Sequence, residues 1–132
     1  MKGRVYDIKK LADSGRFDTT VRNRFYYDNR EYFDALSDFA ENFERDMGNY
    51  TPAFVVNCDE DREEFMKECF EVRASLMRLG AGKLLDLLLV MENAAISRNA
   101  KEFADGQVNF HANLRICQDI VRDAAVKWMI SV

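Results

Sequence analysis

Few side chains in this sequence could carry out acid–base or nucleophilic chemistry. The 132-residue chain has one histidine, His111, and three cysteines at positions 58, 69 and 117, without the paired spacing of a zinc or redox site. His111 also lacks the glutamate three residues earlier that a di-iron helical bundle requires, because that position is Val108. We therefore expect no metal site and no cofactor, and we predict that the protein is not an enzyme.

An acidic run at residues 59–64 is the next candidate site. It lacks the glycine and the alternating oxygen ligands of a calcium loop, so we interpret it as a solvated helix start. Two capping pairs compete to begin that helix, and they are Asn57 with Glu60 and Asp61 with Glu64. Residues 31–65 carry eleven acidic and two basic side chains, which argues against nucleic-acid binding.

Apolar residues recur at helical spacing along the chain, which has one proline and six glycines. Residues 1–14 are expected to form a short helix, and residues 19–25 a further helical turn. The first long helix should begin at Asp28, which forms a capping box with Glu31, and Gly48 should stop or bend it. Thr51 and Pro52 have the types expected at a new helix start.

Three more long helices are predicted. Residues 62–79 carry an inner stripe at spacings of three and four, and Gly80 ends that helix. Residues 81–97 are apolar nearly all round, which is typical of a central helix. The last helix begins with a capping box of Asn99 and Glu102, and its apolar stripe runs from Phe103 to Trp128. Nothing in the sequence reads as a strand.

We therefore predict an all-α protein with a single domain over residues 1–132. Four long helices joined by short turns pack most simply as an up-down-up-down bundle over about residues 28–131, with the N-terminal helix of residues 1–14 covering one end. The N-terminus has no apolar signal region, and the longest apolar run, residues 87–91, is far shorter than the roughly 20 residues that span a bilayer. We expect a cytoplasmic protein with no membrane partner.

The helix of residues 62–79 also carries a second apolar line. At about 100° per residue, Met66, Phe70 and Met77 lie well away from the inner stripe that begins at Phe65, with Arg73 on the core-ward side of the line. Three aligned apolar side chains on an outer face indicate a docking surface. The alternative is that the N-terminal helix or residues 51–56 cover this line.

Residues 69–81 resemble the histidine phosphotransfer (HPt) family, whose members are four-helix relay modules of two-component signalling. The family signature reads Ala-His-x-Leu-Lys-Gly, then five residues, then Gly-Ala. Residues 69–74 read Cys-Phe-Glu-Val-Arg-Ala, and Gly80-Ala81 follow at the same spacing. Residues 24–39 also resemble the start of the family's first long helix, with Tyr26-Tyr27 in place of two glycines. The resemblance covers roughly residues 18–125.

The departures from the signature decide the function that the resemblance implies. Phe70 stands in place of the phospho-accepting histidine, Arg73 in place of the lysine, and Ala74 in place of the glycine that gives the phosphoryl group room. The resemblance therefore implies a non-phosphorylatable adaptor in a phosphorelay. Its partner would be a response-regulator receiver domain or a histidine kinase, with Arg73 facing the acidic pocket of a receiver. The residues expected to bind this partner are Met66, Phe70, Arg73, Ala74 and Met77.

Two other interpretations stay open. The bundle could serve assembly, as a homodimer that uses Leu85, Leu89 and Val90 or the line around Phe70. Alternatively, the chain could be an active relay protein that is phosphorylated on His111. The HPt motif does not support that second alternative, because Arg115 is four residues after His111 rather than three, and no glycine follows.

Overall fold

The chain folds mainly into helices, with one two-stranded sheet, over residues 2–46 and 50–130, which the computed structural model describes. In chain order the elements are β1 (Lys2–Tyr6), α1 (Ile8–Asp13), the 3-10 helix η1 (Thr19–Val21), α2 (Arg22–Phe25), α3 (Asn29–Asp46), α4 (Pro52–Asn57), α5 (Asp59–Leu79), α6 (Gly82–Ile96), α7 (Ala100–Ala124) and β2 (Ala125–Ile130). The prediction of a mostly helical protein is confirmed. No helix within these residues combines the length and apolar character needed to cross a bilayer.

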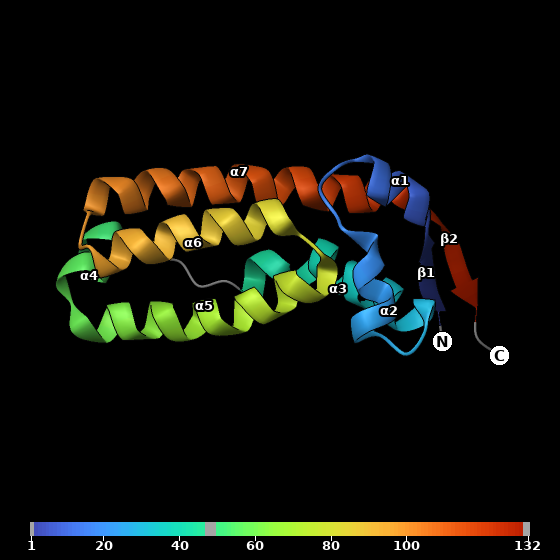
Figure 1. Cartoon of the computed structure of the whole chain (residues 1–132), viewed down its shortest axis with the longest axis horizontal. Helices are drawn as coiled ribbons and strands as arrows, with labels where there is room; N and C mark the ends of the chain where they lie inside the picture. The colour runs from blue at the N-terminus through green and yellow to red at the C-terminus, as the bar shows by residue number, and fades with distance from the viewer. Residues whose placement is uncertain (1, 47–49, 131–132) are drawn as a thin grey trace.

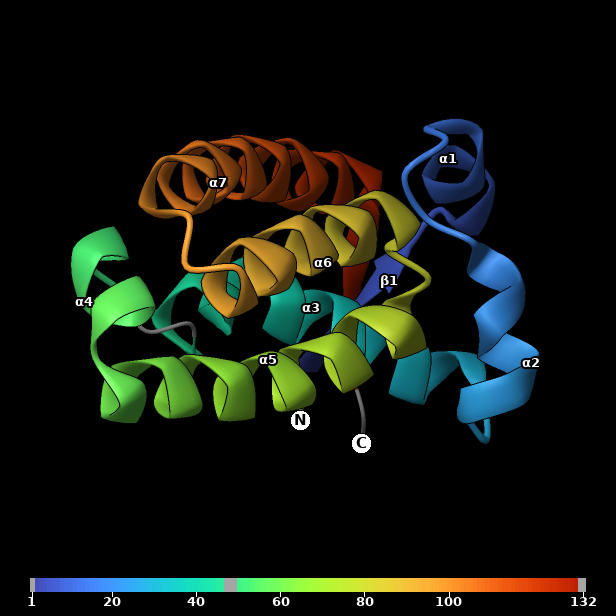
Figure 2. The same ribbon diagram turned by 60° about the vertical axis from the view of Figure 1, so that its left-hand side comes forward.

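The long helices α3, α5, α6 and α7 lie alongside one another, and the chain reverses direction from α5 to α6 and again from α6 to α7 (Figure 1). The small sheet, α1 and α2 gather at one end of these helices, where both termini also lie. In the rotated view, α4 lies at the opposite end, beside the start of α5 (Figure 2). This arrangement leaves one long side of α5 on the surface.

The expected helix over residues 1–14 is wrong in its first part, because Lys2–Tyr6 form a strand. β1 pairs with β2 in an antiparallel ladder, in which Arg4 faces Trp128. Tyr6 is buried, and its hydroxyl lies 2.7 Å from Ser37 Oγ on α3. The strand forms because its backbone groups find hydrogen-bond partners at the far end of the chain. Apolar spacing over only five residues favours a helix too weakly to outweigh this backbone pairing.

The last helix is also shorter than predicted, because α7 ends at Ala124 and the following residues form β2. Trp128, expected on the helical stripe, is therefore in a strand, and the prediction that the chain has no strand is wrong. Valine, tryptophan and isoleucine alternate with other residues in the sequence of this segment, and these residue types are common in strands. The backbone N–H of Asp7 donates to Ala124 O at 2.7 Å, so the N-terminal segment caps the end of α7.

The predicted start of the first long helix is confirmed, with one difference in its capping. Asp28 Oδ1 accepts a hydrogen bond from Glu31 N at 3.0 Å, as a capping box requires. The Glu31 carboxylate reaches back to Tyr27 N at 2.9 Å, one residue before the expected donor. Gly48 lies outside the described residues. Thr51 precedes α4 as predicted.

The helix at the acidic run begins at neither of the two predicted capping pairs. Cys58 ends α4 and is at the same time the N-cap of α5, which starts at Asp59. The turn is this tight because Arg62 Nη1 donates to Val56 O at 3.1 Å, which satisfies a carbonyl at the end of α4. The predicted start of α7 is confirmed, since Asn99 Oδ1 accepts from Glu102 N at 3.0 Å.

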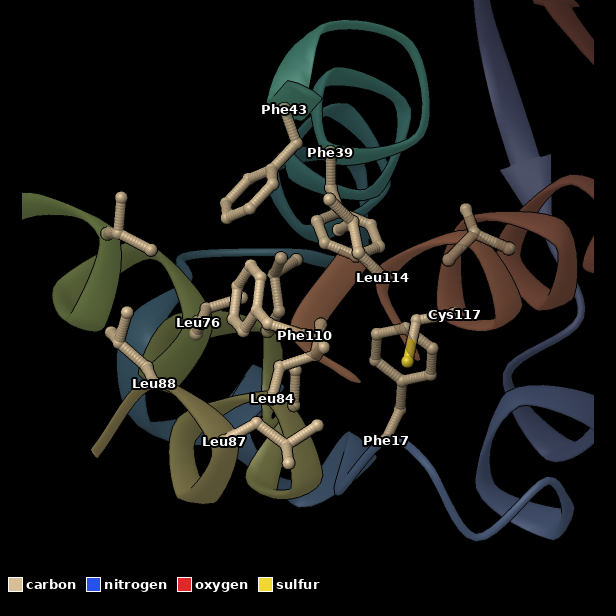
Figure 3. Packing of buried hydrophobic residues seen from close by; sticks show 14 of the residues in the cluster. Phe17, Phe39, Phe43, Leu76, Leu84, Leu87, Leu88, Phe110, Leu114 and Cys117 are labelled. Carbon is tan, nitrogen blue, oxygen red and sulfur yellow. The ribbon is translucent and has the colours of Figure 1, made fainter. Parts of the chain in front are cut away.

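The inner stripes of the long helices form one continuous core. Figure 3 shows Leu76 of α5, Leu84 of α6 and Phe110 of α7 close together beneath Phe39 and Phe43 of α3. The predicted stripe of α5 is buried throughout, and it consists of Phe65, Cys69, Val72, Leu76 and Leu79. The two stripe cysteines, Cys69 and Cys117, are free thiols within this core. α5 is therefore held rigidly through one face while its other face is displayed.

The stability of the fold should change when only the hydroxyl of Tyr32 is removed. The side chain is fully buried, and among the described residues its oxygen has no hydrogen-bond partner. Because an unsatisfied buried hydroxyl is unfavourable, we expect Tyr32→Phe to raise the free energy of unfolding by about 1 kcal/mol at pH 8. Urea unfolding followed by circular dichroism measures this change.

The same variant tests a pH dependence. Burial raises the pKa of Tyr32 to about 12, above the value of about 10 in an unfolded chain. The folded state therefore disfavours ionisation of this phenol, so the free energy of unfolding of the wild type does not depend on its titration below about pH 10 and falls as the pH rises toward 12. Between pH 8 and pH 11, the wild type should lose about 1 kcal/mol more than Tyr32→Phe. Equal losses in both proteins would contradict this account.

Candidate functional site

The predicted docking residues lie in the middle and second half of α5, and we call them the Phe70 face: Met66, Phe70, Arg73, Ala74 and Met77. Phe70 is 72% exposed and Met77 47%, whereas Phe65 on the opposite side of the helix is only 1% exposed. Met66 is partly buried and packs against the core. Neither α1 nor α4 covers Phe70 or Met77, so these two side chains are available to a partner.

α6 extends the Phe70 face. Glu92 of α6 forms an ion pair with Arg73, which fixes the side of α6 that meets this part of α5. Leu89 and Ile96 lie three and four residues from Glu92, so they share that side of the helix, and they are 53% and 64% exposed. The sequence predicts Leu89 on a separate assembly face and does not single out Ile96. The sequence signal that could have grouped Ile96 with Leu89 is their spacing, because residues seven apart lie on the same side of a helix.

The residues of the proposed assembly face, Leu85, Leu89 and Val90, border two different neighbours of α6. Gly106 of α7 lies close to Val90, since a Cβ at Gly106 would be 3.6 Å from Val90 Cγ1. Val90 therefore borders α7, whereas Leu89 lies toward α5. Leu85, seven residues before Glu92, is on the same side of α6 as Leu89.

The Arg73–Glu92 ion pair sets the electrostatics of the Phe70 face. The side chain of Glu92 is only 5% exposed, while that of Arg73 is 43% exposed. A carboxylate so well buried needs a charged partner, and the guanidinium provides one across the α5–α6 junction. Burial raises the pKa of the adjacent Cys69 thiol, and the neighbouring Glu92 carboxylate raises it further. Cys69 is therefore a neutral core residue and not a nucleophile.

Removing the Arg73 charge should destabilise the fold. We expect Arg73→Met to lower the free energy of unfolding by about 1–3 kcal/mol, because it leaves the buried Glu92 carboxylate without its partner. The double variant Arg73→Met/Glu92→Leu should recover most of this loss. Arg78→Met, which removes an exposed arginine from the same helix, is the control and should change stability by less than about 0.5 kcal/mol. Equal effects of Arg73→Met and Arg78→Met in urea unfolding would show that the ion pair is not structural.

The Phe70 face has no group that could accept a phosphoryl group. Phenylalanine has no nucleophilic atom, and the face contains no histidine. His111 lies on α7, half-buried, with its ring edge-on to Phe110 at 6.1 Å between centroids. In the part of the chain that the structure describes, no three His, Cys, Asp or Glu side chains come together to hold a metal ion. The Phe70 face presents apolar side chains and one guanidinium to solvent.

Comparisons of the chain with protein-family models, with curated proteins and with solved structures found no match.

Proposed function

We propose that this protein is a non-phosphorylatable, HPt-like adaptor of two-component phosphorelay signalling, located in the cytoplasm. In this proposal α3, α5, α6 and α7 form the up-down-up-down four-helix bundle of that family. One observation carries the proposal: the residue at the motif position of the phospho-accepting histidine is a phenylalanine whose side chain is 72% exposed on α5. Such exposure is what a docking residue needs and what a core residue lacks.

The chemistry of the Phe70 face suits binding to another protein. Burying an exposed phenylalanine contributes roughly 1.5–3 kcal/mol, and aromatic anchors commonly dominate binding energy. Met77 beside it has a flexible side chain that adapts to the shape of a partner. Leu89 and Ile96 on α6 widen the apolar area around this anchor.

Arg73 has a modified role in this proposal. Its guanidinium is engaged by Glu92, so it cannot act as the free positive charge that the resemblance implied. The ion pair instead holds the Arg73 side chain in one orientation on α5, three residues after Phe70. Because the side chain stays 43% exposed, its remaining N–H groups can donate to a carboxylate of a receiver domain.

The proposal is tested with purified receiver domains and histidine kinases from the same organism. At least one should bind the wild-type protein in calorimetric titration. A phosphorylated receiver should transfer no acid-labile phosphate to this chain. Transfer that disappears in His111→Gln would establish an active relay protein instead. Absence of binding to every receiver and kinase would overturn the adaptor role.

Light scattering tests the assembly alternative. A protein that is monomeric at the concentrations of the titration keeps the Phe70 face free, as the adaptor role requires. A stable homodimer that is broken by Phe70→Ala would show that a second copy covers this face, and it would contradict the proposal.

A further inference from the structure

The small sheet has one edge that the fold leaves open. α3 packs against β1, whereas none of the described helices packs along β2. Figure 1 places β2 outside β1, at the end of the molecule opposite α4. Within the described residues no third strand joins the sheet, so β2 is an edge strand. In an antiparallel pair the backbone groups of alternate residues point away from the partner strand, and in β2 these groups point to the open edge.

The length and composition of β2 suit the addition of a further strand. It runs for six residues, Ala125–Ile130, and contains no proline, glycine or acidic residue. Proline and a covering helix are two common means of blocking an edge strand, and β2 has neither within the described residues. Extended peptides bind to such edges through main-chain hydrogen bonds.

The charges on the sheet select the kind of strand that can add. β1 and β2 together contain the basic residues Lys2, Arg4 and Lys127 and no acidic residue. The carboxylate of Asp34 on α3 lies beside β1, because a Cβ at Gly3 would be 3.7 Å from Asp34 Oδ1. This carboxylate therefore belongs to the side of the sheet that faces α3, and not to the open edge. A strand that carries acidic residues complements the edge.

The start of β2, where α7 ends, carries charges of both signs. Lys10 Nζ donates to Asp123 O at 3.1 Å, which brings a cation to this point. The carboxylate of Asp7 accepts from Lys10 N at 3.1 Å and caps α1. The acidic strand therefore matches the later part of β2, around Lys127.

A second copy of the chain fits the open edge less well. Pairing of β2 with its own copy would create a four-stranded sheet with twice as many basic residues and still no acidic one. Like charges in neighbouring strands are unfavourable. A lysine in an edge strand, such as Lys127, is a common means of preventing such self-pairing.

We propose that the open edge of β2 binds an extended segment of a partner protein in which apolar and acidic residues alternate. Main-chain hydrogen bonds to β2 hold the segment, and its carboxylates provide the selectivity. This edge lies in a different element from the Phe70 face on α5. The inference therefore does not depend on the proposed phosphorelay role.

The probe is a fluorescently labelled synthetic peptide of alternating valine and glutamate, titrated with the full chain and followed by anisotropy. We expect Lys127→Glu to weaken its binding at least about tenfold, because this change puts a like charge into the strand to which the peptide adds. Lys101→Glu makes the same change of net charge at an exposed position in the first turn of α7, at the other end of that helix from β2, and should leave the affinity unchanged. Circular dichroism checks that both variants stay folded.

Two further peptides separate strand addition from general attraction between charges, and neither depends on the folding of a variant. N-methylation of the central amides keeps the glutamates but removes the backbone donors, so this peptide should bind at least about tenfold more weakly. A peptide with lysine in place of glutamate should not bind. The proposal is overturned if the valine–glutamate peptide does not bind, if either altered peptide binds equally well, or if Lys127→Glu and Lys101→Glu weaken binding equally.

Hydrogen exchange followed by NMR tests the open edge itself. In the free chain, alternate amides of β2 should exchange slowly and the others rapidly, and the peptide should slow the rapid set. Light scattering should show a monomer without the peptide. A dimer in which all amides of β2 are already protected would show that a second copy covers the edge, and it would overturn the proposal. Phe70→Ala should leave the affinity for the peptide unchanged, so failure at the Phe70 face and failure at the β2 edge are distinguishable.

Discussion

Replacing Phe65 by alanine should lower the free energy of unfolding by about 3–5 kcal/mol, whereas replacing Phe70 on the same helix should change it by less than about 0.5 kcal/mol. Phe65 is 1% exposed, and its ring packs edge-on against Tyr50 and Phe103 at centroid distances of 5.2 and 5.0 Å. Its removal leaves a cavity between α5 and α7. Phe70 is 72% exposed and leaves no cavity.

This pair of variants is a matched comparison, because both make the same chemical change five residues apart in α5. Urea unfolding followed by circular dichroism gives the two free energies. A large loss of stability in Phe70→Ala would mean that the ring belongs to the core, and the Phe70 face would then not be a docking surface. Similar small effects in both variants would contradict the arrangement of the α5 stripe.

Gly80→Ala should lower the free energy of unfolding by about 3 kcal/mol. Gly80 caps α5 in the left-handed conformation with φ of 73°, which costs roughly 1–2 kcal/mol for a residue with a Cβ. That Cβ would also overlap the backbone carbonyl oxygen of Asp18. Neither backbone can move easily, because Asp18 N donates to Gly80 O at 2.9 Å, and such overpacking adds about 1–3 kcal/mol.

Gly82→Ala provides the control in the same turn. A Cβ at Gly82 meets nothing within 4 Å, and its φ is not in the left-handed region. We expect this change to be neutral or to stabilise the protein by up to about 1 kcal/mol, because alanine favours the helix. The comparison uses thermal and urea unfolding of both variants. Equal stability of Gly80→Ala and the wild type would show that Asp18 does not pack against this turn.

The sequence allowed the α5 helix and its two faces to be predicted because the evidence for them is local. A stripe at spacings of three and four continues from Phe65 to Leu79, and Gly80 marks the end. The same spacing placed Phe70 on the outer side, where the structure has it. Such a periodic pattern over a long helix leaves little freedom for tertiary contacts to change its orientation.

The features that could not be predicted depend on contacts between distant parts of the chain. β1 exists because residues 2–6 find backbone partners in residues 125–130, and neither short segment shows this alone. The Arg73–Glu92 pair requires the relative position of α5 and α6, which the spacing within each helix does not contain. For the same reason the position of Ile96 beside the Phe70 face was not predicted.

The affinity of a receiver domain for the wild type and for Phe70→Ala tests the central claim most directly. For a receiver that binds the wild type, calorimetric titration should show at least about tenfold weaker binding to Phe70→Ala, since the anchor contributes roughly 1.5–3 kcal/mol when buried. Val108→Ala, at a residue on α7 that is also 72% exposed, should bind as the wild type does. Equal affinities of the wild type and Phe70→Ala would contradict the claim that the Phe70 face binds the receiver.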